Sequence, residues 1–198
     1  MAIDRRVART RTALYDSLVS LIREKPYDEI SVEEILGRAD VGRSTFYAHF
    51  TSKDDLLERS LERLYALLMG ALADEPSAAE RGGLARDPCR ALFEHVAEYQ
   101  DVGLALASGR GGVILREAID AVLARALANT VRAKVAGLPR DLVIRHLIGT
   151  FHTVLGWWFT AQPDMAPAAA DALFRQLVLK ALPRDVCGDF LREIDPPG

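Results

Sequence analysis

The segment from Arg38 to Leu57, RADVGRSTFYAHFTSKDDLL, concentrates side chains that can bind a polar surface. The guanidinium of Arg43 can donate two parallel hydrogen bonds, a geometry that suits guanine O6 and N7. Donors to phosphate oxygens follow it at Thr45, Tyr47 and Lys53, with Ser44 and His49 beside them. On spacing alone, DNA binding and an ordinary helical hairpin with a solvated outer face both stay open.

Two short helices must position these groups. Ser31 and Glu34 form a capping-box pattern, which predicts a helix over residues 32–39. A turn at residues 40–42 then leads into a second helix over 43–49. Phe46 and Phe50 stand four residues apart and so share one face, which should pack on apolar residues of the preceding helices. The polar groups are then left on the outer face.

Helical periodicity continues through the rest of the chain, which predicts an all-α fold. The expected helices are 4–24, 32–39, 43–49, 52–73, 88–107, 112–136, 139–161 and 167–182. Residues 74–88 have the composition of a linker, and SGRGG at 108–112 is expected to be a loop. No run of alternating β-branched and polar residues is strong enough to predict a β-strand.

Composition narrows the class of protein. Of the 198 residues, 49% are hydrophobic and the net charge is −3, so any anion-binding surface must be local. One candidate is the N-terminus, because the first eleven residues contain one acidic residue, Asp4, and four arginines: Arg5, Arg6, Arg9 and Arg11. The two cysteines form no CxxC pair, which favours a reducing, cytoplasmic location. Charges interrupt the longest apolar stretch, so no membrane span is expected.

Residues for catalysis or metal binding are not evident. His146 and His152 are six apart and fall on different helix faces, so they cannot pair as a metal site. No Ser-His-Asp order or carboxylate pair stands out. We therefore expect no enzyme activity, no metal and no cofactor.

The region from about Arg9 to Leu57 resembles the DNA-binding region of the tetracycline-repressor (TetR) family. The likeness lies in Ser31-Val32-x-x-Ile35, Ala39, STFYAHF and SKDDLL. It implies a helix-turn-helix DNA-binding domain over 1–52, a connecting helix over 53–73, and a helical dimerisation and effector-binding domain over 88–198. By position, Thr45, Tyr47, His49 and Lys53 would contact phosphates, and Arg43 and Ser44 would face bases. Ser31 would lie near the DNA backbone, with Arg5, Arg6 and Arg9 as a basic arm.

Two turn positions depart from the family pattern. Asp40 stands where the family usually has Gly, and Gly42 stands where it has a Ser or Asn helix cap. Asp tolerates the left-handed conformation and Gly is an acceptable cap, so the turn should form. The missing cap hydroxyl removes one candidate phosphate contact.

The C-terminal part, residues 88–182, is loosely similar to a TetR branch related to the regulator of dihydroxyacetone kinase genes. The resemblance implies a homodimer through helices 139–161 and 167–182, with two recognition helices on a palindromic operator. The aromatic residues suggest either core and interface packing or a small-molecule effector pocket. The candidates for that pocket are Phe93, Tyr99, Phe151, Trp157 and Trp158.

The sequence thus predicts a homodimeric transcriptional repressor that binds double-stranded DNA and responds to a small-molecule effector. The alternative is a helical protein-interaction module, or co-activator, that has lost DNA binding. The turn at Asp40 and Gly42 leaves that alternative open.

Overall fold

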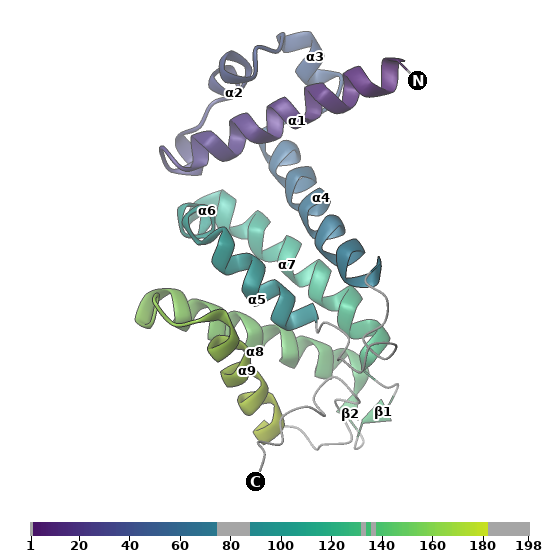
Figure 1. The fold of residues 1–198 in the computed structure, drawn as a ribbon, viewed down its shortest axis with the longest axis vertical. Coiled ribbons are helices and arrows are strands. Elements are labelled where there is room, and N and C mark those ends of the chain that lie inside the picture. The colour runs from purple at the N-terminus through teal and green to yellow at the C-terminus, as the bar shows by residue number, and fades with distance from the viewer. Residues whose placement is uncertain (1, 75–87, 132–133, 136–137, 182–198) are drawn as a thin grey trace. The chain divides into compact units, whose positions relative to one another are not determined.

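The computed structural model describes residues 2–74, 88–131, 134–135 and 138–181 (Figure 1). Helices account for nearly all of them, which confirms the predicted all-α fold. The chain divides into two compact units, and each is described by itself. Unit 1 comprises Met1–Leu67 with Tyr99–Ala118, and unit 2 comprises Leu68–Glu98 with Ile119–Gly198.

Unit 1 contains the N-terminal helices and two segments from later in the sequence. Its elements are α1 (Ala2–Ile22), the 3-10 helix η1 (Tyr27–Glu29), α2 (Val32–Ala39), α3 (Arg43–Tyr47), the first part of α4 (Lys53–Asp74), α6 (Gln100–Leu106) and the first part of α7 (Gly109–Thr130). Helix α1 packs against both α2 and α6. Residues 99–118, assigned from the sequence to the C-terminal part, therefore belong with the N-terminal helices.

The core of unit 1 explains why these helices assemble. The apolar stripe of α1, represented by Leu14 and Leu18, is fully buried. Ile35 from α2 and Phe46 from α3 are also fully buried, and Phe50 is 1% exposed. The two phenylalanine rings lie 5.7 Å apart. Burying each such side chain is worth about 1.5–3 kcal/mol, so this cluster fixes α3 against the domain.

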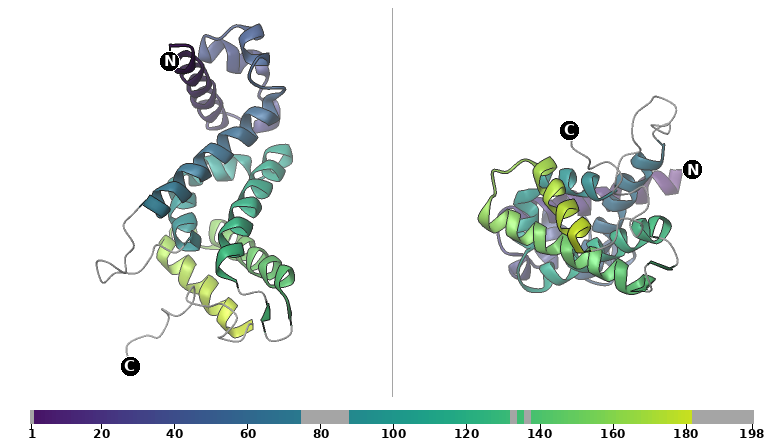
Figure 2. Two further views of the ribbon diagram at one scale, coloured as in Figure 1. Left: turned by 90° about the vertical axis from the view of Figure 1, so that its right-hand side faces the viewer. Right: turned by 90° about the horizontal axis from the view of Figure 1, so that it is seen from below.

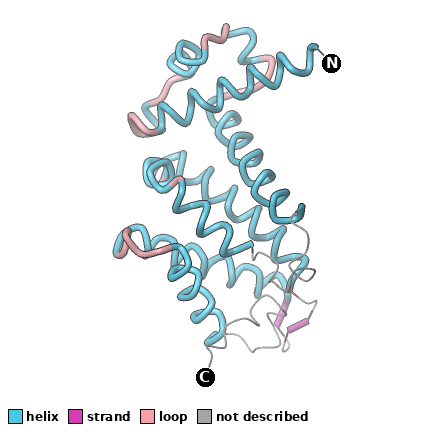
Figure 3. The backbone as a smooth tube through the Cα atoms, in the orientation of Figure 1, coloured by secondary structure: helices cyan, strands magenta, loops and turns pink. Residues whose placement is uncertain are grey.

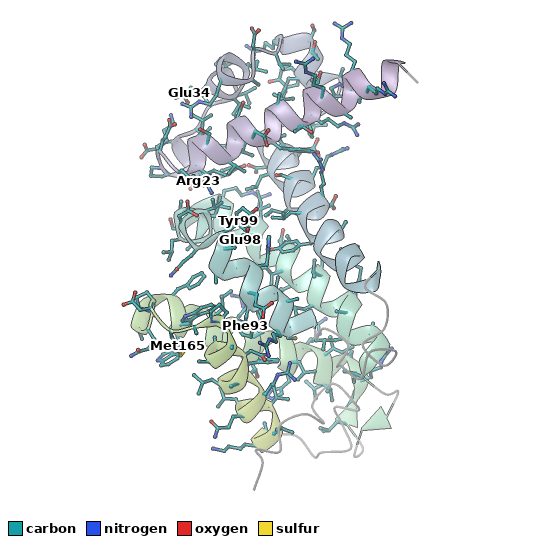
Figure 4. The ribbon with its side chains drawn as sticks, in the orientation of Figure 1. Arg23, Glu34, Phe93, Glu98, Tyr99 and Met165 are labelled. Carbon is teal, nitrogen blue, oxygen red and sulfur yellow. The ribbon has the colours of Figure 1, made fainter. Side chains whose placement is uncertain are left out.

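The ends of α2 form as the sequence predicts. The Ser31 hydroxyl accepts from the Glu34 amide at 3.3 Å, and the Glu34 carboxylate accepts from the Ser31 amide at 2.9 Å (Figure 4). At the other end Asp40 adopts the left-handed conformation with φ 52°. Gly42 caps α3 without a side-chain hydrogen bond. In the tube view, the short turn between α2 and α3 is the pink segment that separates these two cyan helices (Figure 3).

Three expected boundaries were wrong. The helix expected over 88–107 is broken at Tyr99 into α5 (Pro88–Glu98) and α6. The SGRGG segment is not a loop, because Gly109 to Gly112 form the first turn of α7. The helix expected to reach residue 136 ends at Thr130, and a two-stranded antiparallel hairpin follows, β1 (Lys134–Val135) with β2 (Leu138–Pro139).

Unit 2 is built on α5, α8 (Arg140–Ala161) and α9 (Pro167–Ala181) (Figures 1 and 2). Helix α9 packs against both α5 and α8. Its core is aromatic: Phe93, Phe151 and Phe174 are fully buried, and Trp158 is 1% exposed. The Trp158 indole donates to the backbone carbonyl of Met165 at 2.9 Å, which ties the end of α8 to the end of the connection, two residues before α9 begins. Met165 is labelled in Figure 4. In residues 2–74, 88–131 and 138–181, no helix is both long and apolar enough to cross a bilayer.

Candidate nucleic-acid interface

Helix α3 has one buried side and one exposed side. Phe46 is fully buried, whereas Ser44 and Thr45 are exposed and Tyr47 is 48% exposed. Because Phe46 and Phe50 anchor the segment from below, the hydroxyl groups must face away from the domain. Three of the predicted DNA contacts are thus gathered on a single outward surface.

Arg43 is the first residue of α3 and has partners on two sides. Its Nη1 donates to Glu33 Oε1 of α2 at 2.9 Å, and its Cζ lies 5.7 Å from the centroid of the Tyr47 ring. The Arg43 side chain is 66% exposed. The guanidinium therefore has defined contacts without being buried. The sequence analysis did not single out Glu33, and its only sequence signal is a carboxylate ten residues before an arginine across a turn.

His49 and Ser31 are placed differently from the exposed hydroxyls. His49 is half-buried, with its ring 6.4 Å from that of Phe50. Ser31 is half-buried and its hydroxyl takes part in the capping box of α2. DNA contacts by His49 and Ser31 stay predictions. Ser31 also caps the N-terminus of α2.

The predicted basic arm forms the start of α1. Arg5, Arg6 and Arg9 are all exposed there. Three guanidinium groups on the first turns of a helix are free to approach phosphates, and their role stays a prediction.

Lys53 has structural partners that the sequence analysis did not anticipate. Its ammonium donates at 2.8 Å to the backbone carbonyls of both Tyr27 and Ile30, and it lies 4.3 Å from the centroid of the Tyr27 ring. Burial lowers the pKa of this ammonium below its usual range. Two of its three donors thus hold the segment before α2, and the phosphate contact stays a prediction for the third.

The candidates for an effector pocket do not form one group. Phe93, Phe151 and Trp158 pack in the core of unit 2, with the Phe93 and Phe151 rings 4.4 Å apart. Trp157 is 44% exposed and so lies outside that core, unlike the adjacent Trp158. Tyr99 belongs to unit 1. The pocket remains a prediction, and the buried aromatics have the packing of a core.

Metal binding has no candidate in the part of the chain that the structure describes. Within it, no cluster of three or more His, Cys, Asp or Glu side chains could hold an ion. Cys89 is buried, which raises the pKa of its thiol and disfavours the reactive thiolate. Cys187 lies outside the described residues.

The region that contains α2 and α3 is similar to known proteins. Residues 14–59 match the family described as "Bacterial regulatory proteins, tetR family". Relatives of this chain include the HTH-type transcriptional regulator YxbF of Bacillus subtilis, which is 35% identical over 79 residues, 39% of this chain and 21% of the relative. EthR of Mycobacterium tuberculosis is 28% identical over 93 residues, 46% of this chain and 43% of the relative.

Solved structures share the fold over almost the whole chain. A TetR transcriptional regulator from Streptococcus agalactiae is 26% identical, with 90% of this chain and 98% of that one covered and a TM-score of 0.64. The FadR regulator from Bacillus subtilis, solved with stearoyl-CoA, is 18% identical, covers 84% of this chain and 97% of its own, and has a TM-score of 0.57. The latter likeness concerns the fold.

The curated relatives match over limited lengths. The chain spans about a fifth of YxbF and 43% of EthR. Those relatives and the matching family are transcriptional regulators rather than enzymes, which supports the expectation of a chain without catalytic activity. The likeness of the C-terminal part to the branch related to the regulator of dihydroxyacetone kinase genes stays a prediction.

Proposed function

We propose that the chain is a DNA-binding transcriptional regulator that recognises a palindromic duplex as a homodimer. The observation that carries this proposal is the opposite burial of neighbouring residues on α3. Phe46 is fully buried, while Ser44, Thr45 and Tyr47 stand exposed beside Arg43. In helix-turn-helix proteins the N-terminal residues of the second helix contact base edges in the major groove. The TetR-family match over residues 14–59 supports the same role.

Homodimerisation is proposed through α8 and α9. Leu142 and Trp157 of α8 are 52% and 44% exposed, and Leu177 of α9 is 48% exposed. Large apolar side chains exposed on adjacent helices suit a partner surface of the same kind. Gly149 and Gly156 lie on the same exposed side of α8 with open space where a Cβ would be, which permits a close approach of a second helix.

The proposal includes repression and a small-molecule effector. The FadR structure with stearoyl-CoA supports the idea that a protein of this fold holds such a molecule. In our proposal, an effector that binds unit 2 changes DNA affinity only to the extent that it binds the free and DNA-bound states differently. Whether the protein represses or activates can be tested with a reporter gene placed under a DNA sequence that the protein binds. Repression predicts lower expression when the protein is co-expressed, and higher expression would make it an activator.

The decisive experiment is selection of bound duplexes from a random pool with the purified full chain. We expect enrichment of a palindromic sequence. Binding to that sequence should weaken with salt, with a slope of about −0.9 per phosphate contacted in a plot of log affinity against log salt. Failure to retain any duplex at low salt would contradict DNA binding and favour the protein-interaction alternative.

A further inference from the structure

The guanidinium of Arg43 lies between a carboxylate and an aromatic ring that come from two different helices. Glu33 Oε1, in the first turn of α2, accepts from Arg43 Nη1 at 2.9 Å. The Tyr47 ring, one turn along α3, lies 5.7 Å from Arg43 Cζ. Glu33 and Arg43 are 62% and 66% exposed. An exposed arginine with two such neighbours at the proposed DNA surface is restrained in direction and accessible to a ligand.

We propose that Glu33 is a positioning residue that orients Arg43 for its base contact. This inference rests on the proposed function, because it presumes a DNA ligand. An unrestrained arginine side chain samples many rotamers, and part of that rotamer entropy is lost when it binds a ligand. Glu33 and Tyr47 impose that loss before DNA arrives. The ion pair occupies one of the five N–H donors of the guanidinium, so the others remain for guanine O6 and N7.

The charge of Glu33 adds selectivity to this orientation. A carboxylate next to the guanidinium repels phosphate groups, so it disfavours a backbone contact by Arg43 more than a contact to an uncharged base edge. Glu33 thereby lowers affinity for unrelated sequences relative to the preferred one. Both effects act through Arg43, and both predict that the ratio of specific to non-specific affinity falls when Glu33 is removed.

A double-mutant cycle with the full chain tests this assignment. The preferred duplex comes from selection with the wild-type protein, and the base pair read by Arg43 is the one whose preference falls most, without vanishing, in Arg43→Ala. Discrimination is the ratio of dissociation constants for the duplex altered at that pair and the preferred duplex. Arg43→Ala should lower this ratio by about 5- to 150-fold. Glu33→Ala should lower it by about two- to fivefold, the range of an exposed ion pair.

The cycle separates positioning from a structural role. When Glu33→Ala is added to Arg43→Ala, discrimination should not change further. The salt slope of this double variant should stay at the wild-type value. Glu62→Ala removes an exposed carboxylate on α4 and serves as the matched control with wild-type discrimination. If Glu33→Ala lowers the melting temperature, Glu33→Gln replaces it, because glutamine keeps the side-chain length without the charge.

The results that overturn the inference are distinct from failure of the proposed function. If the wild-type protein selects no sequence, the proposed function fails and the inference falls with it. If the wild type selects a sequence but Glu33→Ala leaves discrimination unchanged or raises it, only the role of Glu33 is wrong. A loss that persists in the Arg43→Ala background also contradicts positioning, because it would not act through Arg43.

Discussion

Arg110 and Asp54, 56 residues apart in the sequence, form an ion pair within unit 1. Arg110 Nε donates to Asp54 Oδ2 at 2.8 Å, and the Tyr27 hydroxyl donates to Asp54 Oδ1 at 2.7 Å. Burial raises the pKa of the Tyr27 hydroxyl, and the neighbouring Asp54 carboxylate raises it further. Burial also acts to raise the pKa of Asp54, but the bonds from Arg110 and Tyr27 outweigh it and leave the pKa below its usual value. Asp54 therefore joins the start of α4 to both η1 and α7.

Tyr27→Phe tests the buried half of this junction. Tyr27 is 2% exposed, so the substitution keeps the packing and removes one donor to a charged acceptor. We expect the free energy of unfolding, measured with urea, to fall by about 1–3 kcal/mol. Tyr47→Phe is the control, because the Tyr47 ring is 48% exposed and its loss of a hydroxyl should change stability by less than about 0.5 kcal/mol. Equal stability of the two variants would show that the Tyr27 bond contributes nothing net.

Gly109→Ala tests the first turn of α7. Gly109 has φ +64°, and a Cβ there would lie 1.8 Å from Asp28 Oδ2, whose carboxylate accepts from the Arg110 amide at 3.3 Å. We expect destabilisation of more than about 1 kcal/mol, because alanine in the left-handed conformation costs about 1–2 kcal/mol and Asp28 must also move. Gly37→Ala is the control: open space surrounds it within α2, so it should stabilise by about 0.5–1 kcal/mol. A stabilising Gly109→Ala would contradict this geometry.

Local signals predicted well those features that depend on neighbouring residues. The capping box at Ser31 and Glu34, the left-handed Asp40 and the shared face of Phe46 and Phe50 each depend on residues within four positions. Their energetics are decided by backbone conformation and helical spacing, which a sequence displays directly. The exposed side of α3 followed from them, and the fold class followed from the helical periodicity along the chain.

Features that depend on distant residues could not be predicted in this way. The glycines of SGRGG indicated a loop, but Asp28, 82 residues from Arg110, binds the backbone amide that opens α7. Lys53 matched a phosphate-binding pattern, yet its carbonyl partners lie 26 and 23 residues earlier. Helical periodicity does not indicate such pairs, because they exist only after η1, α4 and α7 have packed together.

Lys53→Ala should affect both stability and DNA binding. Loss of the ammonium removes its bonds to the carbonyls of Tyr27 and Ile30, so the free energy of unfolding should fall by about 1–3 kcal/mol. If the third donor contacts a phosphate, the salt slope for DNA binding, measured well below the melting temperature, should also fall by about one. An unchanged slope would restrict Lys53 to its structural role.

Arg9→Ala is the matched comparison for that measurement. Arg9 is exposed on α1, so its loss should change stability by less than about 0.5 kcal/mol. Its predicted phosphate contact should still lower the salt slope by about one. The pair of variants thus separates an effect on the fold from an effect on the ligand.

Glu34→Gln tests how acid affects α2. Hydrogen bonds from Lys25 and Ser31 lower the pKa of the Glu34 carboxyl to about 2. A carboxyl with a depressed folded pKa stabilises the protein above its unfolded pKa of about 4.3, and this contribution is lost as the pH falls towards the folded value. The wild type should therefore melt at a higher temperature than Glu34→Gln at pH 7, and the difference should shrink between pH 5 and pH 3. A constant difference would show that ionisation of Glu34 does not couple to folding.

The proposed dimer surface can be tested with two leucines of nearly equal exposure. Leu177 on α9 is 48% exposed and Leu104 on α6 is 47% exposed, so the same substitution to Glu perturbs each monomer about equally. Twofold symmetry places Leu177 in the interface twice, and burial of the exposed half of each leucine is worth about 0.7–1.5 kcal/mol. Leu177→Glu should then weaken the dimer by at least about tenfold, measured by sedimentation velocity across a concentration series. Leu104→Glu should sediment as the wild type. Dissociation by Leu104→Glu with an intact Leu177→Glu dimer would move the interface away from α8 and α9.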